Sequence, residues 1–212
     1  NYLLDVHRVK VGDTVKTGLL NGSIGVGKIE IMEDQHIELE VNLTSPPPPP
    51  RPVTLILALP RPKMLKRILQ TTATMGVKNI YLINAYRVEK SYWQTPILSP
   101  ESIREQLIIG LEQGVDTLLP EVHMRKRFKP FVEDELPDMI DNSLALVAHP
   151  SGTENCPVNL NKPTTLAVGP EGGFIDYEVN KLQECGFKML SLGDRILRVE
   201  TAVPVLLGKI HP

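Results

Sequence analysis

The stretch that decides the fold is Leu166-Ala-Val-Gly-Pro-Glu-Gly-Gly-Phe174. Residues 165–168 form an apolar run of the kind found in a buried parallel strand. The paired glycines after it permit positive φ and a close approach of the backbone to a flat ligand, and Pro170 stiffens the turn. A helix is predicted over residues 176–185, with Asp176 as its N-cap. Ligands of parallel α/β sheets bind at such strand-to-helix loops. Taken by itself, however, this segment is also explained by a tight turn that binds no ligand.

A second loop of the same kind follows, Ser191-Leu-Gly-Asp-Arg-Ile-Leu-Arg-Val-Glu-Thr-Ala202. It leaves a predicted strand at residues 188–192 and enters a predicted helix at residues 200–209. The loop carries Arg195 and Arg198, and guanidinium groups present paired donors to planar or anionic oxygens. The alternative is that both arginines pair with nearby acids and only hold the loop in place.

The residues around these loops alternate between apolar runs and helical patterns. Strands are predicted at residues 53–59, 80–83 and 144–148. Helices are predicted at residues 64–75 and 100–113, and Gly76 and Gly186 are the expected helix stops. This alternation predicts an α/β domain, residues 53–212, with a mainly parallel sheet flanked by helices.

The N-terminal residues have a different pattern. Residues 14–20 and 23–31 read as strands joined by an Asn21-Gly22 turn, and a third strand is predicted at residues 36–41. We expect residues 1–45 to form part of a small β-barrel that is incomplete at its N-terminus, because three strands are too few to close. The proline run at residues 46–52 predicts a stiff linker, in preference to a ligand for a proline-binding partner.

Composition limits the class of protein. The chain has 212 residues, 42% hydrophobic and 23% charged, and a net charge of −2. No apolar run approaches the roughly 18 residues that cross a bilayer, and no signal peptide opens the chain, which begins with Asn1. The two cysteines, Cys156 and Cys185, are not spaced as metal ligands are, so we expect no metal site. We expect both to be reduced thiols, which are typical of a cytoplasmic protein. The net charge is unfavourable for general RNA binding, so any RNA site must be local.

Together, the two glycine loops resemble the C-terminal signature of the SPOUT RNA methyltransferases. More narrowly, they resemble the RsmE family of 16S ribosomal RNA (uracil-N3) methyltransferases, over about residues 53–210. The resemblance implies a trefoil knot, a homodimer, and a PUA-like β-barrel in front, with Arg8 at the entry to the barrel. It implies S-adenosylmethionine as cofactor, S-adenosylhomocysteine as product, and ribosomal RNA as substrate, either free or within an assembled small subunit.

The resemblance also implies roles for individual residues. Arg198 would stabilise negative charge on the uracil oxygens. Glu200 would orient Arg198 or relay the N3 proton, although it could equally stabilise its own helix N-terminus. The loop at His149 would form a third wall of the site. The implied cofactor-binding residues are Gly169, Pro170, Glu171, Gly172, Gly173, Leu192, Gly193, Ile196, Leu197, Arg198, Thr201 and Ala202.

Basic residues outside the two loops are candidates for RNA contacts. They are Arg61 and Lys63, and the cluster Arg125, Lys126 and Arg127. For both groups the alternative is a solvated charged surface without a partner. The single tryptophan, Trp93, could stack on a base, but a packing role is favoured for it.

Two segments depart from the family pattern, at residues 72–77 and 112–116, where substrate contacts are expected. Two alternatives therefore stay open: a methyltransferase for another ribosomal or transfer RNA nucleotide, and a non-catalytic RNA-binding or ribosome-assembly factor with the same fold.

Overall fold

The N-terminal strands form an antiparallel sheet of their own. The computed structural model describes residues 9–33 and 36–212, so Arg8 lies outside the described residues. The sheet has the order β1 (Thr14–Gly18), β2 (Ile24–Glu33), β3 (His36–Ser45). The Asn21-Gly22 turn between β1 and β2 is confirmed, and Asn21 has a φ of 59°. Within the described residues these strands make an open sheet, and no closed barrel is seen.

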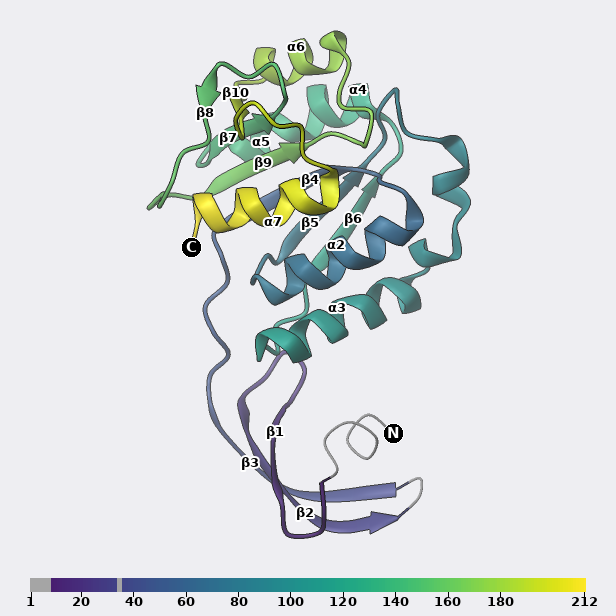
Figure 1. Ribbon diagram of the computed structural model, residues 1–212, viewed down its shortest axis with the longest axis vertical. Coiled ribbons are helices and arrows are strands. Elements are labelled where there is room, and N and C mark those ends of the chain that lie inside the picture. Colours follow the sequence, from purple (N-terminus) through teal and green to yellow (C-terminus); the bar gives the residue numbers. More distant parts are fainter. Residues whose placement is uncertain (1–8, 34–35) are drawn as a thin grey trace.

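A seven-stranded sheet forms the larger part of the molecule (Figure 1). All of its strand pairs are parallel, which confirms the predicted parallel α/β architecture. The central strands are apolar along their length because helices cover both faces. In spatial order the strands are β6 (Glu121–Arg125), β5 (Asn79–Ile83), β4 (Val53–Ala58), β9 (Thr164–Val168), β7 (Leu144–Ala148), β10 (Lys188–Ser191) and β8 (Glu154–Asn155).

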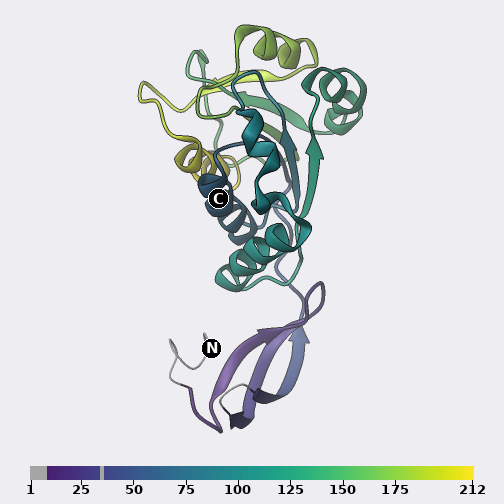
Figure 2. The same ribbon diagram turned by 90° about the vertical axis from the view of Figure 1, so that its right-hand side faces the viewer.

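Helices flank this sheet. On one side α2 (Pro62–Thr74) packs between α3 (Pro100–Gly114) and α7 (Val199–Ile210), as Figures 1 and 2 show. The elements near the other side are α4 (Phe128–Pro130), η3 (Phe131–Glu135), α5 (Leu136–Ile140) and α6 (Asp176–Glu184). Two short 3-10 helices, η1 (Lys90–Gln94) and η2 (Pro96–Leu98), precede α3. No helix of the described ranges has the length and apolar character to cross a membrane.

The N-cap predicted for α6 is wrong. Asp176 is the first residue of the helix, and Ile175 is the N-cap. Glu178, in the first turn, accepts the Ile175 N–H at 3.0 Å. The Glu178 carboxylate, three residues after the cap, thus satisfies the backbone N–H of the N-cap residue itself. Gly186, with a φ of 104°, ends the helix as predicted.

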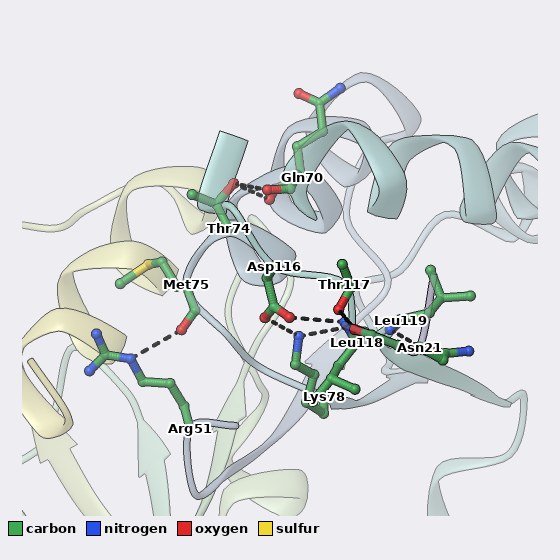
Figure 3. Close-up of polar contacts among 12 residues, drawn as sticks. Asn21, Arg51, Gln70, Thr74, Met75, Lys78, Asp116, Thr117, Leu118 and Leu119 are labelled. Atoms are coloured by element: carbon green, nitrogen blue, oxygen red, sulfur yellow. Dashed lines mark hydrogen bonds and ion pairs between the residues drawn. The ribbon is translucent and has the colours of Figure 1, made fainter. Parts of the chain in front are cut away.

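The two sheets meet where the β1–β2 turn touches the loop before β6 (Figure 3). The N–H of Asn21 donates to the Thr117 carbonyl at 2.7 Å, and the Leu119 N–H donates to the Asn21 side chain at 2.8 Å. The Thr117 hydroxyl donates to the Gly22 carbonyl at 2.5 Å. These three bonds fix the contact at the amino end of β6.

The proline run has neither helix nor strand structure, as expected of an extended linker. It does not stand free, however. Residues 48–52 line one wall of a cavity against the loop after α2, and the Arg51 side chain donates to the Met75 carbonyl at 3.1 Å (Figure 3). The linker therefore packs against the α/β unit.

Candidate active site

A cavity of 360 Å³ opens at the carboxyl ends of β7, β9 and β10. Its volume lies within the range of small-molecule sites, and its place at the strand ends is where parallel α/β sheets bind ligands. The two predicted glycine loops form two of its walls, and the loop after β7 forms the third, as expected. The lining residues are Ala148, His149, Pro150, Gly152, Thr153, Asn155, Val168, Gly169, Pro170, Glu171, Gly173, Leu190, Ser191, Leu192, Gly193, Asp194, Arg195, Ile196, Leu197, Val199 and Ala202.

The first glycine loop is a tight turn after β9. The Gly173 N–H donates to the Pro170 carbonyl at 2.7 Å, and Gly173 has a φ of 74°, which only glycine adopts without strain. A Cβ on Gly169 would lie 2.9 Å from the Phe174 nitrogen, so no larger residue fits there. The turn thus exposes its backbone to the cavity.

Two neighbouring loops hold this turn in place. Glu171 accepts the backbone N–H of Arg61, after β4, at 2.9 Å. The Arg87 guanidinium, after β5, donates to the Gly172 carbonyl. Gly172 does not line the cavity, and a Cβ on it would meet Arg87 at 2.9 Å. Arg87 was not predicted from the sequence, although an arginine four residues after a predicted strand, in a loop at this end of the sheet, was a usable signal.

The second loop supplies apolar surface. Ile196 is 82% exposed, yet it lines the cavity together with the half-buried Leu192 and Leu197. Gly193 has a φ of 105°, and its N–H donates to the Ser191 hydroxyl at 3.1 Å. An exposed apolar wall beside exposed backbone groups suits a planar ligand with polar edges.

The two arginines of this loop differ in position. Arg195 lines the cavity, whereas Arg198 is the N-cap residue of α7 and lies outside the lining. Neither side chain makes an ion pair with the part of the chain that the structure describes. The alternative in which acids neutralise them is therefore not observed there. Glu200 lies in the first turn of α7, where a carboxylate stabilises the helix N-terminus, and neither it nor Thr201 lines the cavity.

The third wall is built on β10. The His149 N–H donates to the Leu190 carbonyl at 3.0 Å, and the His149 ring accepts the Ser151 N–H at 3.2 Å. Gly152 packs directly on the backbone of β10, where a Cβ would overlap Leu190. His149 therefore has a structural role in addition to its place in the lining.

The basic residues proposed for RNA contacts fall into two groups. Arg61, Lys63, Lys126 and Arg127 are exposed. Arg125 instead lies on β6 and donates to both carboxylate oxygens of Glu135 at 2.7 and 2.8 Å, which favours a structural role.

Trp93 is half-buried, and its ring N–H donates to Asn84 at 2.8 Å. The Lys126 ammonium lies 5.9 Å from the centre of its ring. This arrangement agrees with the packing role favoured for Trp93.

Both cysteines are free thiols. Burial raises the pKa of the Cys156 thiol, and burial also raises that of Cys185. Raised pKa values make thiols poor nucleophiles and poor metal ligands. No cluster of three His, Cys, Asp or Glu residues suited to a metal ion occurs at the described positions.

The RNA methyltransferase domain model matches residues 47–211, about three quarters of the chain. The chain belongs to this family. It is similar to the ribosomal RNA small subunit methyltransferase E of Treponema pallidum, with 27% identity over 97% of the chain and 81% of that protein. A methyltransferase of the same name from Synechocystis is 29% identical over 100% of the chain and 70% of its own length.

Solved structures agree with the sequence comparisons. The ribosomal RNA small subunit methyltransferase E of Neisseria gonorrhoeae bound to S-adenosyl methionine has a TM-score of 0.73 and 22% identity, over 97% of this chain and 85% of that one. The structure of a putative methyltransferase of Legionella pneumophila has a TM-score of 0.71 and 24% identity, over 97% of this chain and 85% of that one. At these identities the likeness establishes the fold. The predicted membership of an RsmE-like methyltransferase family is confirmed.

Proposed function

We propose that this RNA methyltransferase uses S-adenosylmethionine to methylate N3 of a uridine in the 16S RNA of the small ribosomal subunit. The observation that carries the proposal is the cavity at the carboxyl ends of β7, β9 and β10, which the two glycine loops enclose. The names of the similar curated proteins support the substrate, and the Neisseria structure supports the cofactor.

The cavity fits such a cofactor in size and chemistry. Ile196, Leu192 and Leu197 offer apolar surface to an adenine ring, and the turn at residues 169–173 offers backbone groups to its polar edges. Glu171 and Ala202 also line the cavity, whereas Gly172, Arg198 and Thr201 lie outside its lining. When bound, S-adenosylmethionine supplies an activated methyl group, and S-adenosylhomocysteine leaves.

The residues of this chain must position the uracil and accept the proton that leaves its N3 atom. As the N3–methyl bond forms, the N3–H bond breaks and negative charge develops on O2 and O4. Arg198, exposed and without an ion pair to the described residues, is the proposed group that stabilises this charge. Glu200, two residues away, is the proposed proton acceptor or the group that orients Arg198.

The proposed RNA surface comprises Arg61, Lys63, Lys126 and Arg127, with Arg8 contributing from outside the described residues. Arg61 and Lys63 follow β4, and Lys126 and Arg127 follow β6, so all four lie at the same sheet edge as the cavity. Arg125 contributes mainly by pairing with Glu135.

We also propose the finer features of the family for this chain: a PUA-like domain over residues 1–45, a linker at 46–52, a knotted domain over 53–212, a homodimer and a cytoplasmic location. The proposal of a knot is supported by the hydrogen bonds of residues 149–160, which join this segment both to the start and to the end of residues 190–210. His149 and Cys156 bond to β10, whereas Asn159 and Leu160 bond to Lys209 and Ile210 at the end of α7.

The cofactor site can be tested by blocking it. Ala202 lines the cavity in the first turn of α7, so the bulky side chain of Ala202→Phe should fill it and abolish S-adenosylmethionine binding in calorimetric titration. Val205→Phe, one turn later and outside the lining, is the matched control and should bind as wild type does. A folded wild-type protein that binds no S-adenosylmethionine would favour a non-catalytic RNA-binding factor.

The chemistry can be tested with Arg198→Ala. This variant should still bind S-adenosylmethionine but lose about 100- to 1,000-fold in methyl transfer rate, as when one charge-stabilising donor is removed. The measurement is transfer of labelled methyl groups to unmodified small ribosomal subunits, with the product mapped by mass spectrometry. A methyl group on another nucleotide would overturn the uridine-N3 assignment and leave the activity standing.

A further inference from the structure

The two most exposed large hydrophobic side chains of the described residues flank the same site. Ile196, 82% exposed, lines the cavity, and Tyr86, 79% exposed, lies on the loop after β5. Tyr86 directly precedes Arg87, whose guanidinium reaches Gly172 in the first glycine loop. Single exposed hydrophobic side chains are normal on protein surfaces, so it is the position of Tyr86 next to the first glycine loop that makes its ring a candidate ligand contact.

The backbone that carries Tyr86 is fixed. Glu178 on α6 is only 3% exposed, and its carboxylate accepts the N–H of Tyr86 at 2.7 Å and that of Ile175 at 3.0 Å. A buried carboxylate is costly unless both oxygens are hydrogen-bonded, so this one ties the β5 loop firmly to the segment after the first glycine loop. The backbone of Tyr86 is thus fixed beside the glycine loop, and its ring extends into solvent.

The charges around Tyr86 suit a polyanion. Arg87 is exposed beside it, Lys126 lies over Trp93 of the same β5–α3 connection, and Arg61 follows β4 at the same sheet edge. The acidic side chains nearby include Glu89, Glu171 and Glu178. Glu171 is bonded to the backbone of Arg61, and the buried Glu178 is bonded to the backbone of Tyr86 and Ile175. Phosphates of a nucleic acid can therefore approach this edge despite the net charge of −2.

We propose that Tyr86 is the stacking platform for the nucleobase of the RNA substrate that enters the site. The inference rests on the proposed function. N3 lies on the Watson–Crick edge of uracil, so the target base must be unpaired and turned out of its helix before methyl transfer. A base turned out in this way loses its stacking partners, and an exposed aromatic ring replaces them. Glu178 and Arg87 are positioning residues that hold the backbone carrying this ring next to the glycine loop.

The first test measures RNA binding without cofactor. Wild-type protein and Tyr86→Ala are titrated with oligouridine and with an abasic oligoribonucleotide of the same length, which keeps the phosphates but lacks the bases. Loss of one stacking contact should weaken oligouridine binding about 5- to 150-fold and leave abasic binding unchanged. Tyr86→Phe should bind as wild type, whereas Tyr86→Leu, which keeps apolar surface without a π-face, should behave as the alanine variant.

The second test measures methyl transfer to unmodified small ribosomal subunits. Tyr86→Ala should raise KM by a comparable factor while the Kd for S-adenosylmethionine stays within twofold of wild type. Equal weakening of both oligonucleotides, unchanged oligouridine binding, or full activity of Tyr86→Leu would each overturn the proposal. A shift of Tyr86→Ala from dimer to monomer in light scattering would also overturn it and assign the ring to an interface between two copies.

The two proposals can fail separately. A wild-type protein that binds no S-adenosylmethionine refutes the proposed function, yet the oligonucleotide titration still decides whether Tyr86 stacks a base. A wild-type protein that binds cofactor and methylates RNA equally well without Tyr86 refutes only the stacking role.

Discussion

Among single residues, His211 links stability to pH. It is buried at the end of α7, and its ring contacts the Thr164 hydroxyl at 3.2 Å. Burial lowers the pKa of His211 below its ordinary value of 6.5, the positive charge of Arg51 lowers it further, and a backbone hydrogen bond at Leu160 partly opposes both. The unfolded chain therefore binds more protons than the folded one as the pH falls through 6.5 towards the lower folded pKa, so stability is lost in that window.

This dependence predicts the behaviour of one variant. In urea denaturation between pH 7.5 and 5.5, His211→Gln should lose less stability than wild type because its side chain cannot be protonated. A wild-type slope in His211→Gln would contradict the assignment.

Between elements, α2 and α3 approach closely at Gly110. A Cβ there would overlap the Gln70 carbonyl and lie 2.8 Å from the Ala73 Cβ. Glycine in a helix interior normally costs about 1 kcal/mol relative to alanine, but overpacking a closed contact costs about 1–3 kcal/mol. Because the nearest obstructing atom is the Gln70 carbonyl oxygen, which belongs to the backbone and cannot move aside, Gly110→Ala should be destabilising in spite of the better helix propensity.

The matched control is Gly208→Ala on α7. Its added Cβ would find only the Met75 methyl group, at 3.9 Å. With no steric cost, the propensity gain should appear as an increase of up to about 1 kcal/mol in the free energy of unfolding. Two stabilising substitutions would show that α2 and α3 are not in close contact.

For the whole molecule, the junction between the two sheets fixes the N-terminal sheet against the loop before β6, and so should set its orientation towards the proposed RNA substrate. The double variant Asn21→Gly, Thr117→Val removes both side-chain hydrogen bonds of the junction, while the introduced glycine tolerates the positive φ of Asn21. Amide hydrogen exchange at residues 19–23 and 117–119 should accelerate, and KM for small subunits should rise about 5- to 10-fold, as expected for the loss of about 1 kcal/mol or slightly more.

Binding of S-adenosylmethionine should not change in the double variant. The junction lies at the amino end of β6, whereas the lining of the cavity lies at the carboxyl ends of β7, β9 and β10. Figure 1 shows where these strands lie in the sheet. A weaker cofactor affinity would mean that the junction also shapes the cavity and would contradict this separation.

Local sequence determined the elements of this protein and the two loops of its candidate site. Apolar runs, helical spacing and glycine stops depend on neighbouring residues alone, so β4, β7, β9, α2 and α7 lie within about two residues of their predicted bounds. The glycines of residues 169–173 and 193 were likewise visible, because positive φ and tight turns are local requirements. Short elements with mixed polar and apolar residues, such as β6 and η3, lack such a pattern and were missed.

The tertiary structure alone decided how these elements complete the site. It placed β9 between β4 and β7, which brings three loops around one cavity, and it turned Gly172 towards Arg87 instead of the cavity. The contacts responsible join residues far apart in the chain: Arg87 and Gly172 are 85 positions apart, and Tyr86 and Glu178 are 92 apart. The spacing of apolar residues along the chain cannot predict such pairs, because they form only when strands distant in sequence align their carboxyl ends at one edge of the sheet.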